Sequence, residues 1–222
     1  MEFIKKSFQH ITLRTALVAL AFWVPVGIFL KLAGEIIEKE PLAFDVYLLE
    51  KIHSYATPFL DTVFITITNI GGIVAVILIT LALAVFYFYK RRYSDLYFIV
   101  LSVTGASITN LLLKVAFQRD RPSLFTQAVV EQGFSFPSGH AMASAALVTC
   151  LVLIYFKTSK RWAVIIFGGI AVFLIGLSRL YLGVHYPSDI IAGWSVSVIW
   201  VLLSFYVTER LIKTRLESKK PR

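Results

Sequence analysis

Three short stretches of this sequence carry residues whose types and spacing could do chemistry. The first reads LKVAFQRDRPS and places Lys114 seven residues before Arg121. Two fixed cations suit a dianion such as a phosphate, whether or not one helix carries both. Pro122 predicts that the helix ends before Arg121. The alternative interpretation is two basic side chains that reach from the end of a membrane helix to water, and this stretch alone leaves both open.

The second stretch, FPSGHAMAS, has the features of a helix start. Ser138 is a good N-cap residue, and the residues after it supply free backbone N–H groups that attract anions. Gly139 lets a ligand approach the backbone closely, and His140 follows in the first turn as a possible acid or base. The alternative is an ordinary serine cap followed by an interfacial histidine.

The third stretch, GLSRLYLGVHYPSDIIAG, combines Arg179 with a histidine and an aspartate four residues apart, His185 and Asp189. Asp189 could accept a hydrogen bond from one ring nitrogen of His185, which would fix the tautomer and raise the nucleophilicity of the other nitrogen. The alternatives are an acid that complements a helix dipole and a loop histidine without a role.

The elements that must position these residues are membrane helices. Hydrophobic residues make up 58% of the 222 residues and charged residues 16%, against about 45–50% and about 25% in soluble domains. We expect one domain over residues 1–222, an all-α polytopic membrane helix bundle. Its six transmembrane helices are predicted at 15–33, 69–89, 95–117, 139–156, 162–181 and 190–207. The segment FDVYLLEKIH mixes charged and apolar residues at near-helical spacing, which predicts a short interfacial amphipathic helix between helices one and two.

The basic residues predict the orientation of this bundle. The formal net charge is +9, which in a soluble protein would raise the question of nucleic acid; in a membrane protein the positions of Lys and Arg indicate topology first. Of the 22 Lys and Arg residues, fifteen lie at the two termini or in the loops on the same side of the membrane as the termini, and seven lie on the opposite side. Both termini are therefore expected in the cytoplasm. All three polar stretches then meet at the outer mouth of the bundle.

Together these residues have the composition of a phosphoryl-transfer site. One histidine attacks phosphorus, cations and backbone N–H groups stabilise the phosphoryl oxygens, and the second histidine protonates the leaving oxygen. We expect no metal and no cofactor, because the sequence near these residues has no carboxylate cluster of the Mg²⁺ or Zn²⁺ type.

At these residues the chain resembles the type 2 phosphatidic acid phosphatase superfamily, which also includes the vanadium haloperoxidases. Three motifs mark that family: K-x6-R-P, P-S-G-H and S-R-x5-H-x3-D. All three occur here in order with matching spacing, from Lys114 to Pro122, from Pro137 to His140 and from Ser178 to Asp189.

The resemblance implies a role for each matched residue. His185 would be the nucleophile, Asp189 its orienting partner and His140 the general acid. The phosphate would be bound by the remaining matched residues, Lys114, Arg121, Ser138, Gly139 and Arg179. Arg119 and Asp120 lie inside the first motif without matching a required position, so no role is expected for them.

Within the family the chain is similar to small bacterial membrane enzymes that remove the terminal phosphate of a lipid at the outer face of the cytoplasmic membrane. Phosphatidylglycerol phosphate, undecaprenyl diphosphate, phosphatidic acid and lipid A phosphates are the substrates to consider, and the partners expected are such a lipid and the bilayer. No nucleic acid and no protein partner is indicated.

Two other functions are weighed against this one. Haloperoxidases are soluble, which six spans disfavour. A transporter or a lipid-binding protein with a phosphate site would not hydrolyse its ligand. Transporters place ionisable residues near the middle of the bilayer, whereas here they gather at span ends.

Overall fold

The computed structural model describes residues 2–38, 42–125 and 129–217, and the regular structure in these ranges is α-helical. The helices follow one another as α1 Glu2–Ile37, α2 Ala43–His53, α3 Pro58–Ile70, α4 Ile73–Tyr89, α5 Tyr93–Phe117, α6 Gly139–Tyr155, α7 Arg161–Tyr181 and α8 Pro187–Glu217. The absence of strands from the described ranges agrees with the predicted all-α class.

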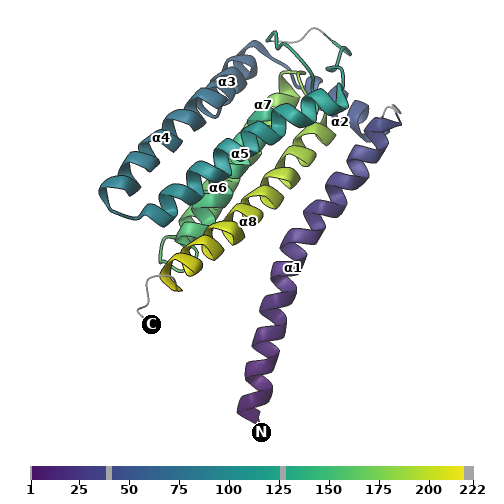
Figure 1. Ribbon diagram of the computed structural model, residues 1–222. Helices are drawn as coiled ribbons and strands as arrows, with labels where there is room; N and C mark the ends of the chain where they lie inside the picture. The colour runs from purple at the N-terminus through teal and green to yellow at the C-terminus, as the bar shows by residue number, and fades with distance from the viewer. Residues whose placement is uncertain (1, 39–41, 126–128, 218–222) are drawn as a thin grey trace.

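Helix α6 is the centre of the bundle. It packs against α5, α7 and α8, and also contacts α4. Helix α1 packs on α8 but diverges from it toward the N-terminus (Figure 1). Only 6% of the apolar stretch within Thr15–Ile37 of α1 is buried inside the protein, so most of its side chains face outward. An apolar helix with this exposure suits a lipid environment.

Within the described residues, five helical segments are long and apolar enough to cross a membrane: Thr15–Ile37, Pro58–Tyr89, Tyr93–Phe117, Arg161–Tyr181 and Pro187–Ile212. The apolar helix Gly139–Tyr155 is shorter than these, although it lies at the centre of the bundle. Multiple membrane helices are therefore present, and the count of six spans stays a prediction.

The second predicted span, at 69–89, differs from the structure. Helix α4 covers most of it, but a further helix, α3, runs into it from Pro58 and ends at Ile70. The side chain of Thr57 caps α3 by accepting the N–H of Leu60 at 3.3 Å, which gives α3 a start that the apolar pattern does not show. A Cβ atom at Gly71 would lie 2.2 Å from Cγ1 of Ile175, so glycine is needed for α3 to approach α7.

Helix α2 forms where the interfacial amphipathic helix is predicted. It buries Asp45 and Leu49, and it contacts α7 and α8. Its placement at the membrane surface stays a prediction. Through its contacts with α7 and α8, it covers one end of the bundle (Figure 1).

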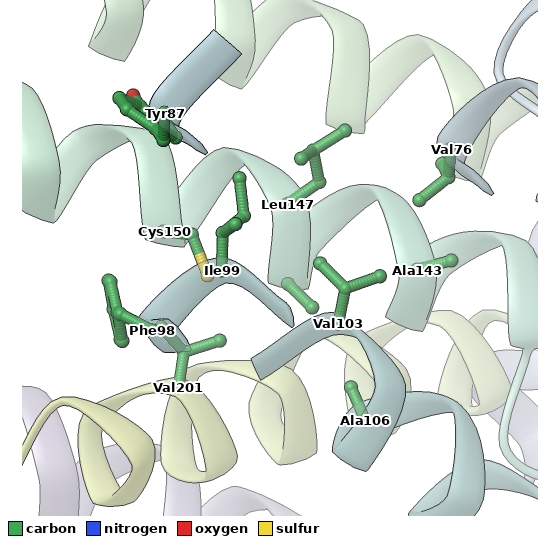
Figure 2. Close-up of a cluster of buried hydrophobic side chains, with 11 residues drawn as sticks. Val76, Tyr87, Phe98, Ile99, Val103, Ala106, Ala143, Leu147, Cys150 and Val201 are labelled. Atoms are coloured by element: carbon green, nitrogen blue, oxygen red, sulfur yellow. The ribbon is translucent and has the colours of Figure 1, made fainter. Parts of the chain in front are cut away.

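The main apolar core joins four helices. Its side chains, drawn in Figure 2, come from α4 (Val76, Tyr87), α5 (Phe98, Ile99, Val103, Ala106), α6 (Ala143, Ala146, Leu147, Cys150) and α8 (Val201). The single cysteine, Cys150, is buried among them. Burying this much apolar surface fixes the register of the four helices and so the position of their ends.

Candidate active site

The three polar stretches meet at one end of the bundle. Figure 1 shows the α5–α6 connection, the α7–α8 turn and helix α2 at this end. The first stretch follows the C-terminus of α5, the second begins α6, and the third joins α7 to α8. The convergence expected from topology is therefore present in the described structure.

His185 lies in the turn before α8 with only 2% of its surface exposed. Its Nδ1 is 3.3 Å from Oδ2 of Asp189, and the same oxygen accepts the N–H of Tyr186 at 2.9 Å. A carboxylate can only accept, so the proton belongs on Nδ1, and Nε2 carries the lone pair. Burial lowers the pKa of His185 to about 4, although the hydrogen bond and charge of Asp189 act in the opposite direction. The imidazole is therefore neutral at pH 7.

Arg121 faces the free nitrogen of this imidazole, with its Nη1 3.3 Å from Nε2. Helix α5 ends at Phe117, and Gln118 follows in the left-handed region with φ of 47°, so the helix stops before Arg121 as Pro122 predicts. Backbone carbonyls hold the guanidinium instead: Val184 O accepts from Nη1 at 2.9 Å, Gly133 O from Nε at 2.9 Å and Gln132 O from Nη2 at 3.0 Å. Burial lowers the pKa of Arg121, but a guanidinium remains charged in proteins.

Arg179 supplies a second buried cation, with 1% of its surface exposed. Its Nη1 donates to Oγ1 of Thr68 at 2.7 Å, and its Nη2 forms an ion pair with Glu131. Its Nε has no hydrogen-bond partner among the described residues. A buried N–H without an acceptor is costly, so this nitrogen marks a place where a bound acceptor would be favourable.

Glu131 lies between the two arginines. Besides its ion pair with Arg179, its Oε2 is 3.9 Å from Nη2 of Arg121. Burial raises the pKa of Glu131, but the charge and hydrogen bond of Arg179 lower it by more, so the net pKa lies below its ordinary value. The two guanidinium groups thus already accommodate one anionic group.

The start of α6 closes the site from another side. Ser138 is its N-cap, and its Oγ accepts the N–H of Ala141 at 3.5 Å, as predicted. The N–H of Ser138 donates to the carbonyl of Asp189 at 3.1 Å, which ties the start of α6 to the start of α8. A Cβ atom at Gly139 would lie 3.2 Å from Oδ1 of Asn110, so a larger residue would crowd this helix start. His140 interacts electrostatically with four groups of the site: Arg179, Glu131, His185 and Arg121.

Lys114 reaches the site from the last turn of α5. Its Nζ donates to the carbonyl of Phe134, and it interacts electrostatically with Arg121, Asp189, Glu131 and Arg179. All eight residues predicted from the sequence therefore lie at one end of the bundle. The polar residues that complete their surroundings without having been predicted include Asp45, Thr68, Asn110, Arg119, Glu131 and Ser188.

The sequence indicates only some of these surrounding residues. Arg119 is one of the few basic residues on the predicted outer side, which sets it apart. Asp45 and Glu131 lie in stretches without a phosphoryl-transfer motif, and nothing in their local sequence separates them from ordinary loop acids.

Comparison with known proteins identifies the family of this chain. The family model of the PAP2 superfamily matches residues 95–213. Phosphatidylglycerophosphatase B of Bacillus subtilis is 34% identical over 166 residues, which cover 71% of this chain and 80% of that protein. An undecaprenyl-diphosphatase of Sulfolobus acidocaldarius is 29% identical over 183 residues, which cover 80% and 83% of the two chains.

Solved structures extend the similarity to the fold. The crystal structure of a transmembrane PAP2 type phosphatidylglycerolphosphate phosphatase from Bacillus subtilis matches with a TM-score of 0.74 and 27% identity, covering 84% of this chain and 96% of that one. The crystal structure of Aquifex aeolicus LpxE has the same fold, with a TM-score of 0.63, 23% identity and coverage of 75% and 98%. With the motifs, the bundle and these relatives in agreement, the chain belongs to the PAP2 superfamily and is a multi-pass membrane lipid phosphatase.

Proposed function

We propose that this phosphatase removes the terminal phosphate of a lipid monophosphate or diphosphate through a phosphohistidine on His185, without a metal ion. The observation that carries the proposal is the environment of the imidazole. Asp189 engages Nδ1 at 3.3 Å, and the Arg121 guanidinium lies 3.3 Å from Nε2. The nitrogen with the lone pair therefore faces the cations that would bind a phosphate.

In the first step, the lone pair of His185 Nε2 attacks phosphorus and the bond from phosphorus to the leaving oxygen breaks. His140 donates its proton to that oxygen. A bound phosphate dianion favours the protonated form of a neighbouring imidazole, which supports this role. The positive charge on the phosphorylated ring of His185 is stabilised by Asp189 through the Nδ1–H.

The cations and the start of α6 bind the oxygens that do not react. Lys114, Arg121 and Arg179 supply three positive charges, and the unpaired Nε of Arg179 supplies a donor. Ser138 and the backbone N–H of Gly139 are proposed as further contacts, because a helix N-terminus favours an anion. These groups take the charge-stabilising role that metal ions have in many other phosphoryl-transfer enzymes.

In the second step, a water molecule attacks phosphorus and the phosphorus–nitrogen bond breaks. His140, now neutral, accepts a proton from the water, and His185 recovers its lone pair. Inorganic phosphate is the product, and its loss frees the cations for the next substrate.

The site is proposed to face the outside of the bacterial cytoplasmic membrane, with both termini in the cytoplasm and residues 1–222 forming one membrane-embedded domain. A lipid head group could reach this end of the bundle while its acyl or prenyl chains remain in the bilayer. The substrates proposed are phosphatidylglycerol phosphate, undecaprenyl diphosphate and phosphatidic acid. A lipid A 4'-phosphatase of Bacteroides thetaiotaomicron, 37% identical over 89 residues, supports adding lipid A phosphates.

Phosphate release from this panel, by purified protein in detergent with excess EDTA, tests the proposal. Release from at least one lipid is expected, with loss of activity in a His185→Asn variant and inhibition by vanadate, which mimics five-coordinate phosphorus. Activity that is lost in EDTA and restored by Mg²⁺ would contradict the metal-free mechanism. Activity that survives in His185→Asn would contradict the phosphohistidine.

A further inference from the structure

Arg119 makes several side-chain hydrogen bonds beside Asp189, the partner of the proposed nucleophile His185. Its Nη1 donates to Oδ1 of Asp189 at 2.6 Å and to Oγ of Ser188 at 2.7 Å. Its Nη2 donates to Oδ2 of Asp45 at 2.7 Å. The side chain of Arg119 is only 14% exposed, and the ring of Tyr186 lies 4.1 Å from its guanidinium carbon. One guanidinium thus bridges two buried carboxylates.

Asp45 anchors this guanidinium from α2. It is 1% exposed, and it also accepts the N–H of Ser188 at 2.8 Å and the hydroxyl of Ser188 at 2.5 Å. Ser188 lies in the first turn of α8, where backbone N–H groups lack partners within the helix. The Asp45 carboxylate therefore fixes both Arg119 and the helix start that carries Asp189, from a position 143 residues before Ser188.

The two oxygens of Asp189 have separate partners. Oδ2 engages Nδ1 of His185 and the N–H of Tyr186, while Oδ1 receives the short contact from Arg119. A carboxylate held at both oxygens cannot rotate without breaking one of these contacts. The orientation of the imidazole thus depends on Asp189, and the orientation of Asp189 depends on Arg119.

We propose that Arg119 and Asp45 act as a positioning pair for the nucleophile, holding the Asp189 carboxylate so that His185 Nε2 points at the phosphate. The inference rests on the proposed function, in which His185 attacks phosphorus. Arg119 acts through Asp189 and does not bind the phosphate. The cost of misplacing a reacting group is large: about 1 Å can reduce a rate by about 100-fold.

The contacts of Arg119 distinguish it from the phosphate-binding cations. Both of its terminal nitrogens are engaged by carboxylates, which offset its charge. Burial lowers the pKa of Arg119, but Asp189 and Asp45 raise it by more, so the net shift is upward. Arg179, by contrast, keeps an unpaired buried Nε, and Arg121 contacts Nε2 of His185.

A cavity of about 500 Å³ makes the proposal testable by chemical rescue. Its lining includes Asp45, Arg119 and Tyr186 together with the end of α1, and it contains none of the eight residues predicted to bind or react with the phosphate. In an Arg119→Ala variant, a free guanidinium ion could enter from this cavity and restore the bridge between the two carboxylates.

The experiment compares Arg119→Gln, Arg119→Ala and Asp45→Asn with wild type, in detergent and with one lipid substrate. For Arg119→Gln we expect kcat to fall by about 10- to 100-fold, with KM and the inhibition constant of inorganic phosphate within about twofold. Millimolar guanidinium chloride should raise kcat of Arg119→Ala, while NaCl at equal ionic strength should not. Asp45→Asn keeps the shape of the side chain and should lower kcat without rescue.

The outcomes separate this inference from the proposed function. If wild type releases no phosphate from any lipid phosphate, the proposed function is wrong. If wild type is active but Arg119→Gln raises KM and the phosphate inhibition constant with kcat unchanged, Arg119 binds phosphate and the inference is wrong. Unchanged kinetics in Arg119→Gln, or rescue by NaCl as effective as by guanidinium, also overturns it. If the arginine variants do not fold, a normal kcat in Asp45→Asn overturns it.

Discussion

The Nε2 nitrogen of His185 lies 3.3 Å from Nη1 of Arg121. The contact places a fixed positive charge beside the one ring nitrogen that Asp189 leaves free. A phosphoryl group that replaced this contact would meet the lone pair and the cation together. The two histidines of the site differ, because the Asp189 carboxylate lies 3.3 Å from Nδ1 of His185, whereas His140, in the first turn of α6, has no carboxylate within hydrogen-bond distance among the described residues.

Replacing each histidine should have a different dependence on the leaving group. His185→Asn should abolish turnover of every substrate, because no phosphoenzyme can form. His140→Asn should damage monoester hydrolysis more than diphosphate hydrolysis, since an alkoxide needs a proton to leave and a phosphate needs it less. General acid catalysis contributes about 10²–10⁴-fold, which sets the scale of the difference.

The measurement is the ratio of monoester to diphosphate hydrolysis in wild type and in His140→Asn. Both substrates should carry the same lipid chain, so that binding of the chain cancels. A ratio that does not change would show that His140 is not the general acid. Turnover by His185→Asn would show that the nucleophile is another group.

The sequence predicted the local parts of this site well. Ser138 as an N-cap and the end of α5 before Arg121 both follow from backbone rules that act over a few residues. The spacing of Lys114 and Arg121 leaves open whether one helix carries both cations. The structure answers this, because Arg121 takes its position from loop carbonyls.

Contacts between distant segments could not be predicted in the same way. Asp45 reaches Ser188 across 143 residues, and Thr68 reaches Arg179 across 111. Such pairs depend on how α2 and α3 pack on α7 and α8, which propensity and periodicity do not determine. The start of α3 escapes prediction for a different reason. Thr57 followed by Pro58 is a local capping signal, but the spans are predicted from apolar runs alone.

The orientation of the bundle can be tested with single cysteines in a Cys150→Ala background. Ser123 and Ser159 are exposed residues at opposite ends of the described bundle, in the α5–α6 and α6–α7 connections. From the distribution of basic residues we expect a membrane-impermeant thiol reagent to label Ser123→Cys in intact cells and Ser159→Cys only after the cells are opened. The reverse pattern would place the active site in the cytoplasm.

Stability should fall in acid partly because of His185. Its pKa is about 4 in the folded protein, against about 6.5 for an ordinary histidine. Between these values the unfolded chain binds the proton and the folded one does not, so lowering the pH from about 6.5 to about 4 favours unfolding. Above pH 6.5 neither state is protonated, and the contribution is fully present.

The thermal midpoint in detergent measures this effect. Between pH 7 and pH 4 we expect the thermal midpoint of wild type to fall by more than that of His185→Asn. Between pH 7 and pH 8 the two midpoints should change in parallel. Equal losses in acid would mean that His185 is protonated in the folded state or that its burial is not maintained.

Glu131 should compete with the substrate for the two arginines. Its carboxylate pairs with Arg179 and lies 3.9 Å from Arg121, so a phosphate that uses both guanidinium groups must displace it. The Glu131 side chain is 30% exposed but that of Arg179 only 1%, so removing the carboxylate leaves a buried guanidinium without its ionic partner, which favours binding of another anion. Glu131→Gln should therefore lower KM and the inhibition constant of inorganic phosphate. Asp120→Asn, which removes an exposed carboxylate of the same connection, is the matched control and should leave both constants unchanged. A higher KM in Glu131→Gln would instead mean that Glu131 holds Arg179 in its binding position, and the competition would be disproved.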